Sequence, residues 1–135
     1  MKKNKILVVD DELDMRIFIS TLLETSGYEP IMTSNGKDGI RQARTRLPDI
    51  IILDVMMPGE GGVQMYRQLK TDAILKNIPV IMLSAVAEKT FSHYLKMLNV
   101  RLENPVPDPE AYMEKPPEAD ELLKITESLI RRKSG

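Results

Sequence analysis

The chain has 135 residues, which suits one domain built around one hydrophobic core and leaves no room for two domains of ordinary size. Hydrophobic residues make up 42% and charged residues 29%, so a folded globular protein is expected rather than a disordered one. The net charge of -1 provides no electrostatic reason to expect nucleic acid as a partner, and the absence of cysteine excludes disulfides, thiolate zinc sites and cysteine nucleophiles.

Short apolar runs alternate with longer segments of helical periodicity along the chain. Three of the runs are rich in β-branched residues and carry no charge, which is typical of strands buried on both faces of a parallel sheet. Two weaker runs contain Pro30 and Glu114, and a proline or a charge favours a place at the edge of a sheet. In chain order, the expected elements are strand 6–9, helix 13–26, strand 29–33, helix 36–47, strand 50–53, helix 61–71, strand 80–83, helix 88–98, strand 111–114 and helix 118–132.

Each helix is expected to bury one apolar face against the sheet. Five strand–helix units in succession predict an α/β fold, a doubly wound five-stranded parallel sheet of order 2-1-3-4-5 flanked by five helices. One domain over residues 1–135 is expected to contain the whole fold. Helix by helix, the expected inward-facing residues are Leu13, Ile17 and Leu23; Ile40, Ala43 and Leu47; Gly62, Tyr66 and Leu69; Phe91, Leu95 and Leu98; and Leu122, Ile125 and Leu129.

Polar side chains follow four of the strands, at the points where the strands end. In such a sheet the ligand crevice lies beyond the carboxyl ends of the central strands, so these side chains are expected to meet at one rim. The set is Asp10, Asp11 and Glu12 after the first strand, Asp54 after the third, Ser84 after the fourth and Lys115 after the fifth.

Clustered carboxylates repel one another unless one takes up a proton or a cation binds. Oxygen ligands in a partly hydrated acidic pocket favour Mg²⁺, and an ionised aspartate beside the cation can attack phosphorus. A lysine and a hydroxyl can then neutralise or donate to phosphoryl oxygens, although the residue types alone do not say which reaction they serve.

Each of these residues also has a local explanation. Asp11 or Glu12 could cap the following helix, and Asp54 could belong to an ordinary Pro-Gly turn. Ser84 could be a helix cap and Lys115 a solvated surface lysine. The occurrence of all four motifs at four successive strand ends favours a common site over four independent coincidences.

With these motifs the chain resembles the receiver domains of bacterial two-component response regulators. The resemblance covers nearly the whole chain and depends on Asp10-Asp11, on Asp54 in Asp-Val-Met-Met-Pro-Gly, on Ser84-Ala85 and on Lys115-Pro116. It implies a switch in which Asp54 accepts a phosphoryl group, and not an enzyme beyond self-phosphorylation and slow self-dephosphorylation.

The same resemblance implies the roles of the other residues. Asp11, Asp54 and the backbone carbonyl of Met56 would bind Mg²⁺ directly, and Asp10 would act through water. Ser84 and Lys115 would contact the phosphoryl group, and the Lys115–Pro116 bond would be cis.

Tyr112 lies three residues before Lys115, where the family keeps an aromatic residue that turns inward on activation. An edge-strand tyrosine that only packs is the equal alternative.

Residues 101–110, here named the Pro-rich loop, lengthen the connection between the fourth helix and the fifth strand. Three prolines make a regular helix there improbable and predict an extended or turn-rich segment. The loop adjoins the helix 4–strand 5 face that receivers use for partners and dimers. A partner-specific contact and a tolerated surface insertion are both consistent with this position, and the second is slightly favoured.

The phosphodonor is expected to be a sensor histidine kinase or a phosphotransfer protein, because the only histidine, His93, lies away from the acidic motifs. The output is expected to pass to a downstream protein or an attached output domain, with a phosphorylation-dependent dimer as a further partner state. The apolar run at 6–9 is too short for a signal peptide or a membrane helix, which favours a cytoplasmic protein.

Three other functions compete with the switch. A haloacid dehalogenase-type phosphatase would need a second aspartate two residues after Asp54, where Met56 stands. A flavodoxin-like cofactor binder would need a phosphate loop after the first strand, where an acidic pair stands. A degenerate receiver acting as a binding module would not need the intact acidic, hydroxyl and lysine positions.

Overall fold

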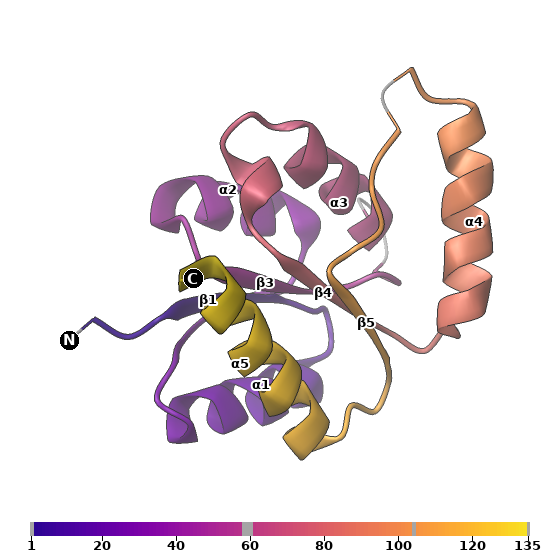
Figure 1. The fold of residues 1–135 in the computed structure, drawn as a ribbon. Coiled ribbons are helices and arrows are strands. Elements are labelled where there is room, and N and C mark those ends of the chain that lie inside the picture. Colours follow the sequence, from indigo (N-terminus) through magenta and orange to yellow (C-terminus); the bar gives the residue numbers. More distant parts are fainter. Residues whose placement is uncertain (1, 58–60, 104, 135) are drawn as a thin grey trace.

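The computed structural model describes residues 2–57, 61–103 and 105–134, and these form one parallel sheet covered by helices on both faces (Figure 1). The sheet has five strands in the order β2-β1-β3-β4-β5, as the alternation of elements predicts. The elements are β1 (Lys5–Val9), α1 (Leu13–Thr25), β2 (Glu29–Thr33), α2 (Gly36–Arg46), β3 (Ile50–Asp54), α3 (Gly62–Thr71), a 3₁₀ turn η1 (Leu75–Asn77), β4 (Val80–Ser84), α4 (Glu88–Val100), β5 (Ala111–Glu114) and α5 (Ala119–Ser134).

The two faces of the sheet have separate cores because successive strand residues point to opposite sides. In β1, Leu7 and Val9 belong to the core shared with α2, α3 and α4, whereas Ile6 and Val8 belong to the core shared with α1 and α5. Every residue of β3 and β4 is buried, which explains why these runs carry so few polar side chains.

The strand register brings the ends of the central strands to one rim. Val9 of β1 lies opposite Leu53 of β3, so the residues that follow, Asp10 and Asp54, are neighbours across the strand pair. Asp54 in turn lies opposite Leu83 of β4. The edge positions of β2 and β5 are also as predicted.

The inward-facing residues predicted for α1 are wrong at Leu13 and Ile17, whose side chains are 60% and 55% exposed. The buried residues are Ile19 and Leu23. Ile17 and Leu23 are six residues apart, which places them about 120° apart on a helix of 3.6 residues per turn. The predicted stripe therefore combined two different faces of α1.

The prediction for α2 is wrong at Leu47, which is 52% exposed. The helix ends at Arg46, and Leu47 is its C-cap with a left-handed φ of 46°. It therefore lies beyond the last turn, where the periodicity no longer applies. Predicted inward-facing residues on α3, α4 and α5 such as Tyr66, Phe91 and Leu122 are buried.

The Pro-rich loop contains no helix or strand among its described residues, as its prolines predict. Pro58 and Gly59, which form the predicted turn after Asp54, lie outside the described residues, as does Asn104 in the loop. Among the described helices, none has the length and apolar character needed to cross a membrane.

Candidate functional site

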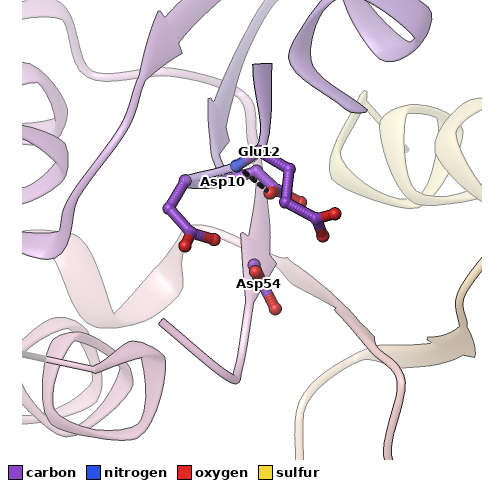
Figure 2. A group of neighbouring side chains, drawn as sticks. Asp10, Glu12 and Asp54 are labelled. Atoms are coloured by element: carbon purple, nitrogen blue, oxygen red, sulfur yellow. Dashed lines mark hydrogen bonds between the residues drawn. The ribbon is translucent and has the colours of Figure 1, made fainter. Parts of the chain in front are cut away.

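Four carboxylates gather where β1 and β3 end. Asp10, Asp11, Glu12 and Asp54 each offer an oxygen, and these oxygens lie within 4.8 Å of one another. Figure 2 shows Asp10 and Glu12 on the connection after β1 and Asp54 at the end of β3. Asp10 and Asp54 are only 1% and 3% exposed, whereas Asp11 and Glu12 face solvent. The cluster thus has a buried part and a part that solutes can reach.

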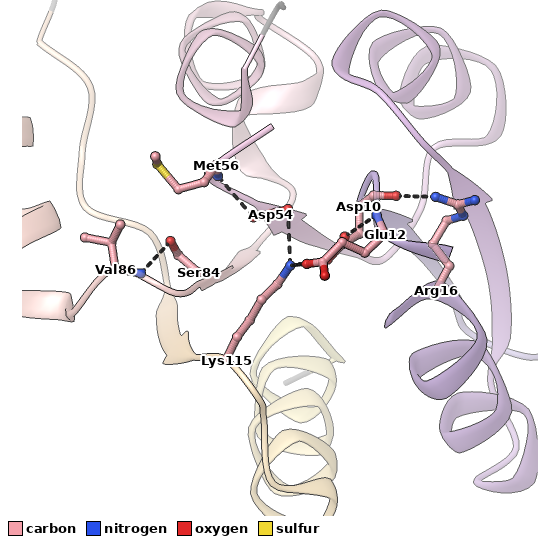
Figure 3. A network of polar contacts seen from close by, with 8 residues as sticks. All are labelled: Asp10, Glu12, Arg16, Asp54, Met56, Ser84, Val86 and Lys115. Atoms are coloured by element: carbon pink, nitrogen blue, oxygen red, sulfur yellow. Dashed lines mark hydrogen bonds and ion pairs between the residues drawn. The ribbon is translucent and has the colours of Figure 1, made fainter. Parts of the chain in front are cut away.

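The turn after β1 is held by bonds to its backbone. The Asp10 N–H donates to the carbonyl of Thr33, and the Asp10 carbonyl accepts a 2.7 Å bond from Arg16 Nη1 of α1. The Asp10 side chain accepts from the Glu12 N–H at 2.9 Å through Oδ1 (Figure 3). These bonds fix the buried carboxylate and leave its second oxygen, Oδ2, directed elsewhere.

Asp54 is held in a similar way at the end of β3. Its Oδ1 accepts from the Met56 N–H at 3.0 Å. The start of α3 packs directly on this segment, because a Cβ on Gly62 would lie 2.0 Å from the Asp54 carbonyl oxygen. Only glycine fits this approach, so Gly62 sets the position of the strand end against α3.

Lys115 is the cation of the cluster. Its Nζ lies 2.8 Å from Asp10 Oδ2, 2.7 Å from Glu12 Oε1 and 3.2 Å from Asp54 Oδ2, and its side chain is 10% exposed. Its backbone N–H donates to the Ser84 carbonyl at 2.8 Å, so the hydrogen bonding between β4 and β5 continues as far as the rim. The Lys115–Pro116 peptide bond is cis, as expected.

The cluster has more negative than positive charge, with four carboxylates around one ammonium group. Burial and the neighbouring Asp10 charge raise the pKa of Asp54, and the Met56 N–H and Lys115 only partly oppose this. Burial by itself would lower the pKa of Lys115, but the contacts with Asp10 and Glu12 outweigh burial. The net effect is a raised pKa, so the lysine stays charged. The bond to Lys115 lowers the pKa of Glu12.

The donor set fits a hard divalent cation. Asp10 Oδ2 is buried and receives no hydrogen bond of good geometry, although Lys115 Nζ is close to it. Lys115 shares its one charge among three carboxylates, so a second cation would further stabilise the buried Asp10 and Asp54. Carboxylate oxygens with solvent access on one side are the ligands that Mg²⁺ prefers.

Ser84 and Tyr112 lie on the other side of Asp54, toward α4. Ser84 is completely buried, and its Oγ accepts from the Val86 N–H at 3.0 Å. The Tyr112 hydroxyl donates to the Val86 carbonyl at 2.5 Å, and the ring stacks on Phe91 with centroids 5.4 Å apart. Val86 therefore links the hydroxyl of β4 to the tyrosine of β5.

The local explanations offered for Glu12, Ser84 and Lys115 are not realised in the structure. Glu12 occupies the N-cap position of α1 but makes no side-chain capping bond. The N-cap of α4 is Ala87, so Ser84 does not cap that helix. Lys115 is mostly buried, so it is not a solvated surface lysine.

Sequence reasoning missed three participants. Glu12 was recognised as acidic but was given no role, although it makes the shortest contact with Lys115. The Arg16 guanidinium donates to the backbone carbonyl of Asp10, and Val86 acts through its own N–H and carbonyl, so neither bond can be predicted from residue type. Only the acidic run itself could have signalled Glu12.

A family model described as response regulator receiver domain matches residues 6–127. Among curated relatives, the polar-differentiation response regulator DivK of Brucella anthropi is 42% identical over 89 residues, which cover 66% of this chain and 72% of DivK. Protein PilH of Pseudomonas aeruginosa is 32% identical over 126 residues, which cover 93% of this chain and 97% of PilH.

A longer relative matches over the same region. The phosphate regulon transcriptional regulatory protein PhoB of Pseudomonas aeruginosa is 35% identical over 94% of this chain, but the chain spans only 52% of PhoB. Among solved structures, the receiver domain of the Francisella response regulator 1452 superposes with a TM-score of 0.81 at 29% identity, covering 97% of this chain and 99% of that domain.

Proposed function

Because this chain belongs to the response regulator receiver domain family, whose members are phosphoacceptor signalling switches, we propose that Asp54 is its phosphoacceptor. The observation that carries this proposal is the position of Asp54 at the end of the central strand β3, close to three other carboxylates and 3.2 Å from the Lys115 ammonium. Nothing in the comparisons favours the haloacid dehalogenase-type phosphatase.

The reaction is a displacement at phosphorus. A carboxylate oxygen of Asp54 attacks the phosphoryl group of a phosphohistidine, an O–P bond forms, the P–N bond breaks, and its electron pair returns to the histidine nitrogen. Burial disfavours the charged form of Asp54, so the carboxylate needs nearby positive charge to stay ionised as a nucleophile. Lys115 supplies one such charge.

Mg²⁺, when bound, would supply further positive charge for the carboxylates and for the phosphoryl oxygens. Asp11, Asp54 and the Met56 carbonyl would hold it directly, with Asp10 acting through water. The excess of carboxylates over the single ammonium of Lys115 and the solvent access of Asp11 support this assignment.

Lys115 would pair with a phosphoryl oxygen and Ser84 would donate its hydroxyl to another. For its role Lys115 must give up present contacts, because it now binds three carboxylates. Ser84 Oγ accepts from the Val86 N–H and can donate its hydroxyl proton at the same time. Tyr112 is tied to the same Val86, so movement of Ser84 would release or redirect the Tyr112 ring. This coupling favours a switching role for Tyr112 over simple packing.

The phosphodonor is proposed to be a sensor histidine kinase or a phosphotransfer protein in the cytoplasm. The altered helix 4–strand 5 surface would act on a downstream protein or an attached output domain, and it would form the contact of a phosphorylation-dependent dimer. PhoB is named as a transcriptional regulatory protein, and it is about twice as long as the region that matches this chain. That length is consistent with a receiver attached to an output domain.

Incubation with Mg²⁺ and acetyl phosphate tests the proposal. Intact-protein mass spectrometry should find one added phosphoryl group on the wild type and none on Asp54→Asn. Asp14→Asn is the matched control, because Asp14 is an exposed aspartate in the first turn of α1. An unlabelled wild type, or a labelled Asp54→Asn variant, would refute the assignment.

A further inference from the structure

Residues 105–110 of the Pro-rich loop attach it to the body of the fold. Val106 is only 3% exposed and belongs to the core formed by the sheet, α3 and α4. Figure 1 shows this segment running between α3 and α4. A side chain buried between two helices is not expected of a passive surface insertion.

Polar bonds add to the apolar anchor at the C-terminal end of α4. The Asn99 side chain donates to the Val106 carbonyl at 2.9 Å and accepts from the Val106 N–H at 2.9 Å. The hydroxyl of Tyr66, on α3, donates to the Pro107 carbonyl at 2.6 Å. One loop therefore joins the last turn of α4 to the middle of α3.

A third anchor joins the loop to the start of β4. Glu110 accepts the Val80 N–H at 2.7 Å, so it satisfies the first amide of the strand. The ammonium of Lys70, whose side chain is 3% exposed, lies 3.3 Å from the same carboxylate. Lys70 also donates to the Ile78 carbonyl, and it lies over the Tyr66 ring.

The N-terminal half of α4 is attached differently, because its buried residue Phe91 stacks on Tyr112 of β5. Its N-cap is Ala87, which offers no capping side chain, and alanine is a poor residue at that position. A groove of about 940 Å³ is lined by residues 87–90, Ser92, His93, Lys96 and Glu114, and a hollow of about 180 Å³ is lined by Glu88, Phe91, Ser92 and residues 108–112. Both spaces leave room beside the half of α4 that follows Ser84.

We propose that the Pro-rich loop is a hinge anchor for α4, one that regulates how the helix moves when the switch is used. The loop holds residues 97–100 against α3 and β4, while residues 88–93 move with the segment that carries Ser84 and Val86. The coupling to phosphorylation depends on the function proposed above, but the anchor itself does not.

Residue-resolved amide hydrogen exchange by NMR tests the anchor without any phosphodonor. In the wild type the Val106 amide should be protected although it lies in a loop, and amides 98–100 should exchange more slowly than amides 92–94. Asn99→Ala removes two hydrogen bonds and should raise exchange at Val106 and at 98–100 about ten-fold or more. Tyr66→Phe keeps the ring and should have a smaller effect in the same direction.

Asn77→Ala is the matched control, because Asn77 is exposed in η1 and should leave exchange near α4 unchanged. An unprotected Val106 amide in the wild type, or unchanged exchange in both Asn99→Ala and Tyr66→Phe, would overturn the anchor.

Addition of Mg²⁺ and beryllofluoride, a phosphoryl mimic, tests the hinge. Chemical-shift changes should be large at 84–93 and at Tyr112 and small at 97–107 in the wild type, and they should spread into 97–107 in Asn99→Ala. Equal changes along the whole of α4 in the wild type would refute the hinge. No response anywhere would refute the proposed function and with it the hinge, whereas the exchange experiment would still decide the anchor.

Discussion

Lys115 compensates two carboxylates that are almost completely buried, and replacing it with methionine should destabilise the metal-free protein. The Nζ group lies within 3.2 Å of carboxylate oxygens of both Asp10 and Asp54. Removing one partner of a buried ion pair typically costs about 3–5 kcal/mol because a charge is left uncompensated. Taking the lower end for two charges that share one cation, about 3 kcal/mol is expected. With an m-value of about 1.5 kcal/mol/M, this lowers the urea midpoint by about 2 M.

The deficit of Lys115→Met should depend on pH. Asp54 already has a raised pKa in the folded state, and the loss of Lys115 removes an effect that lowers it. A carboxyl whose pKa is higher in the folded state binds more protons there, so stability falls as pH rises from the unfolded-state value, about 3.9, through the raised folded-state value. The deficit should therefore be small near pH 4 and should grow as pH rises through the raised pKa of Asp54.

Urea unfolding followed by circular dichroism, with EDTA present, measures this deficit at several pH values. Lys96→Met is the control, because Lys96 is an exposed lysine on α4. Adding Mg²⁺ should reduce the deficit, since the cation replaces part of the lost charge. An unchanged midpoint at pH 7.5, or a deficit equally large near pH 4, would show that Lys115 does not compensate the buried carboxylates.

Three further outcomes are expected. Asp54→Asn should raise the urea midpoint of the metal-free protein at pH 7.5, and this gain should vanish as pH falls through the raised pKa of Asp54 because the wild-type carboxyl is then neutral too. In thermal unfolding, Gly62→Ala should lower the free energy of unfolding by about 3 kcal/mol, since its Cβ would meet the Asp54 carbonyl oxygen. Gly27→Ala should lower it by only about 1–2 kcal/mol, because Gly27 has open space around it and only its φ of 91° is unfavourable for alanine. Saturation with Mg²⁺ at about 100 times its dissociation constant should stabilise the wild type by about 2.7 kcal/mol in differential scanning calorimetry, and Asp11→Ala should lose most of this gain at the same Mg²⁺ concentration.

The strands and their order could be predicted because both depend on local pattern. Unbroken apolar runs identify strands covered on two faces, and proline and charge identify edge strands, as Pro30 and Glu114 did. The inner face of α1 could not be predicted, because apolar residues occur on two of its faces and only packing decides which is buried. Leu13 and Ile17 therefore remain exposed while Ile19 and Leu23 are covered.

The Pro-rich loop shows the same limit. Its prolines correctly exclude a helix, but nothing in the residue types indicates that Val106 is buried or that Asn99 binds its backbone. Those contacts depend on where α3 and α4 come to lie relative to each other.

The sequence alone determined the chemistry of the rim, because parallel strands that alternate with helices place their carboxyl ends together and so bring Asp10, Asp54 and Lys115 to one place. Only the tertiary structure decided how these groups interact. Glu12 and Lys115 are 103 positions apart in the chain, and their contact depends on the twist and spacing of strands that no local pattern records. The raised pKa of Asp54 arises mainly from burial, a property of the whole fold rather than of any one segment.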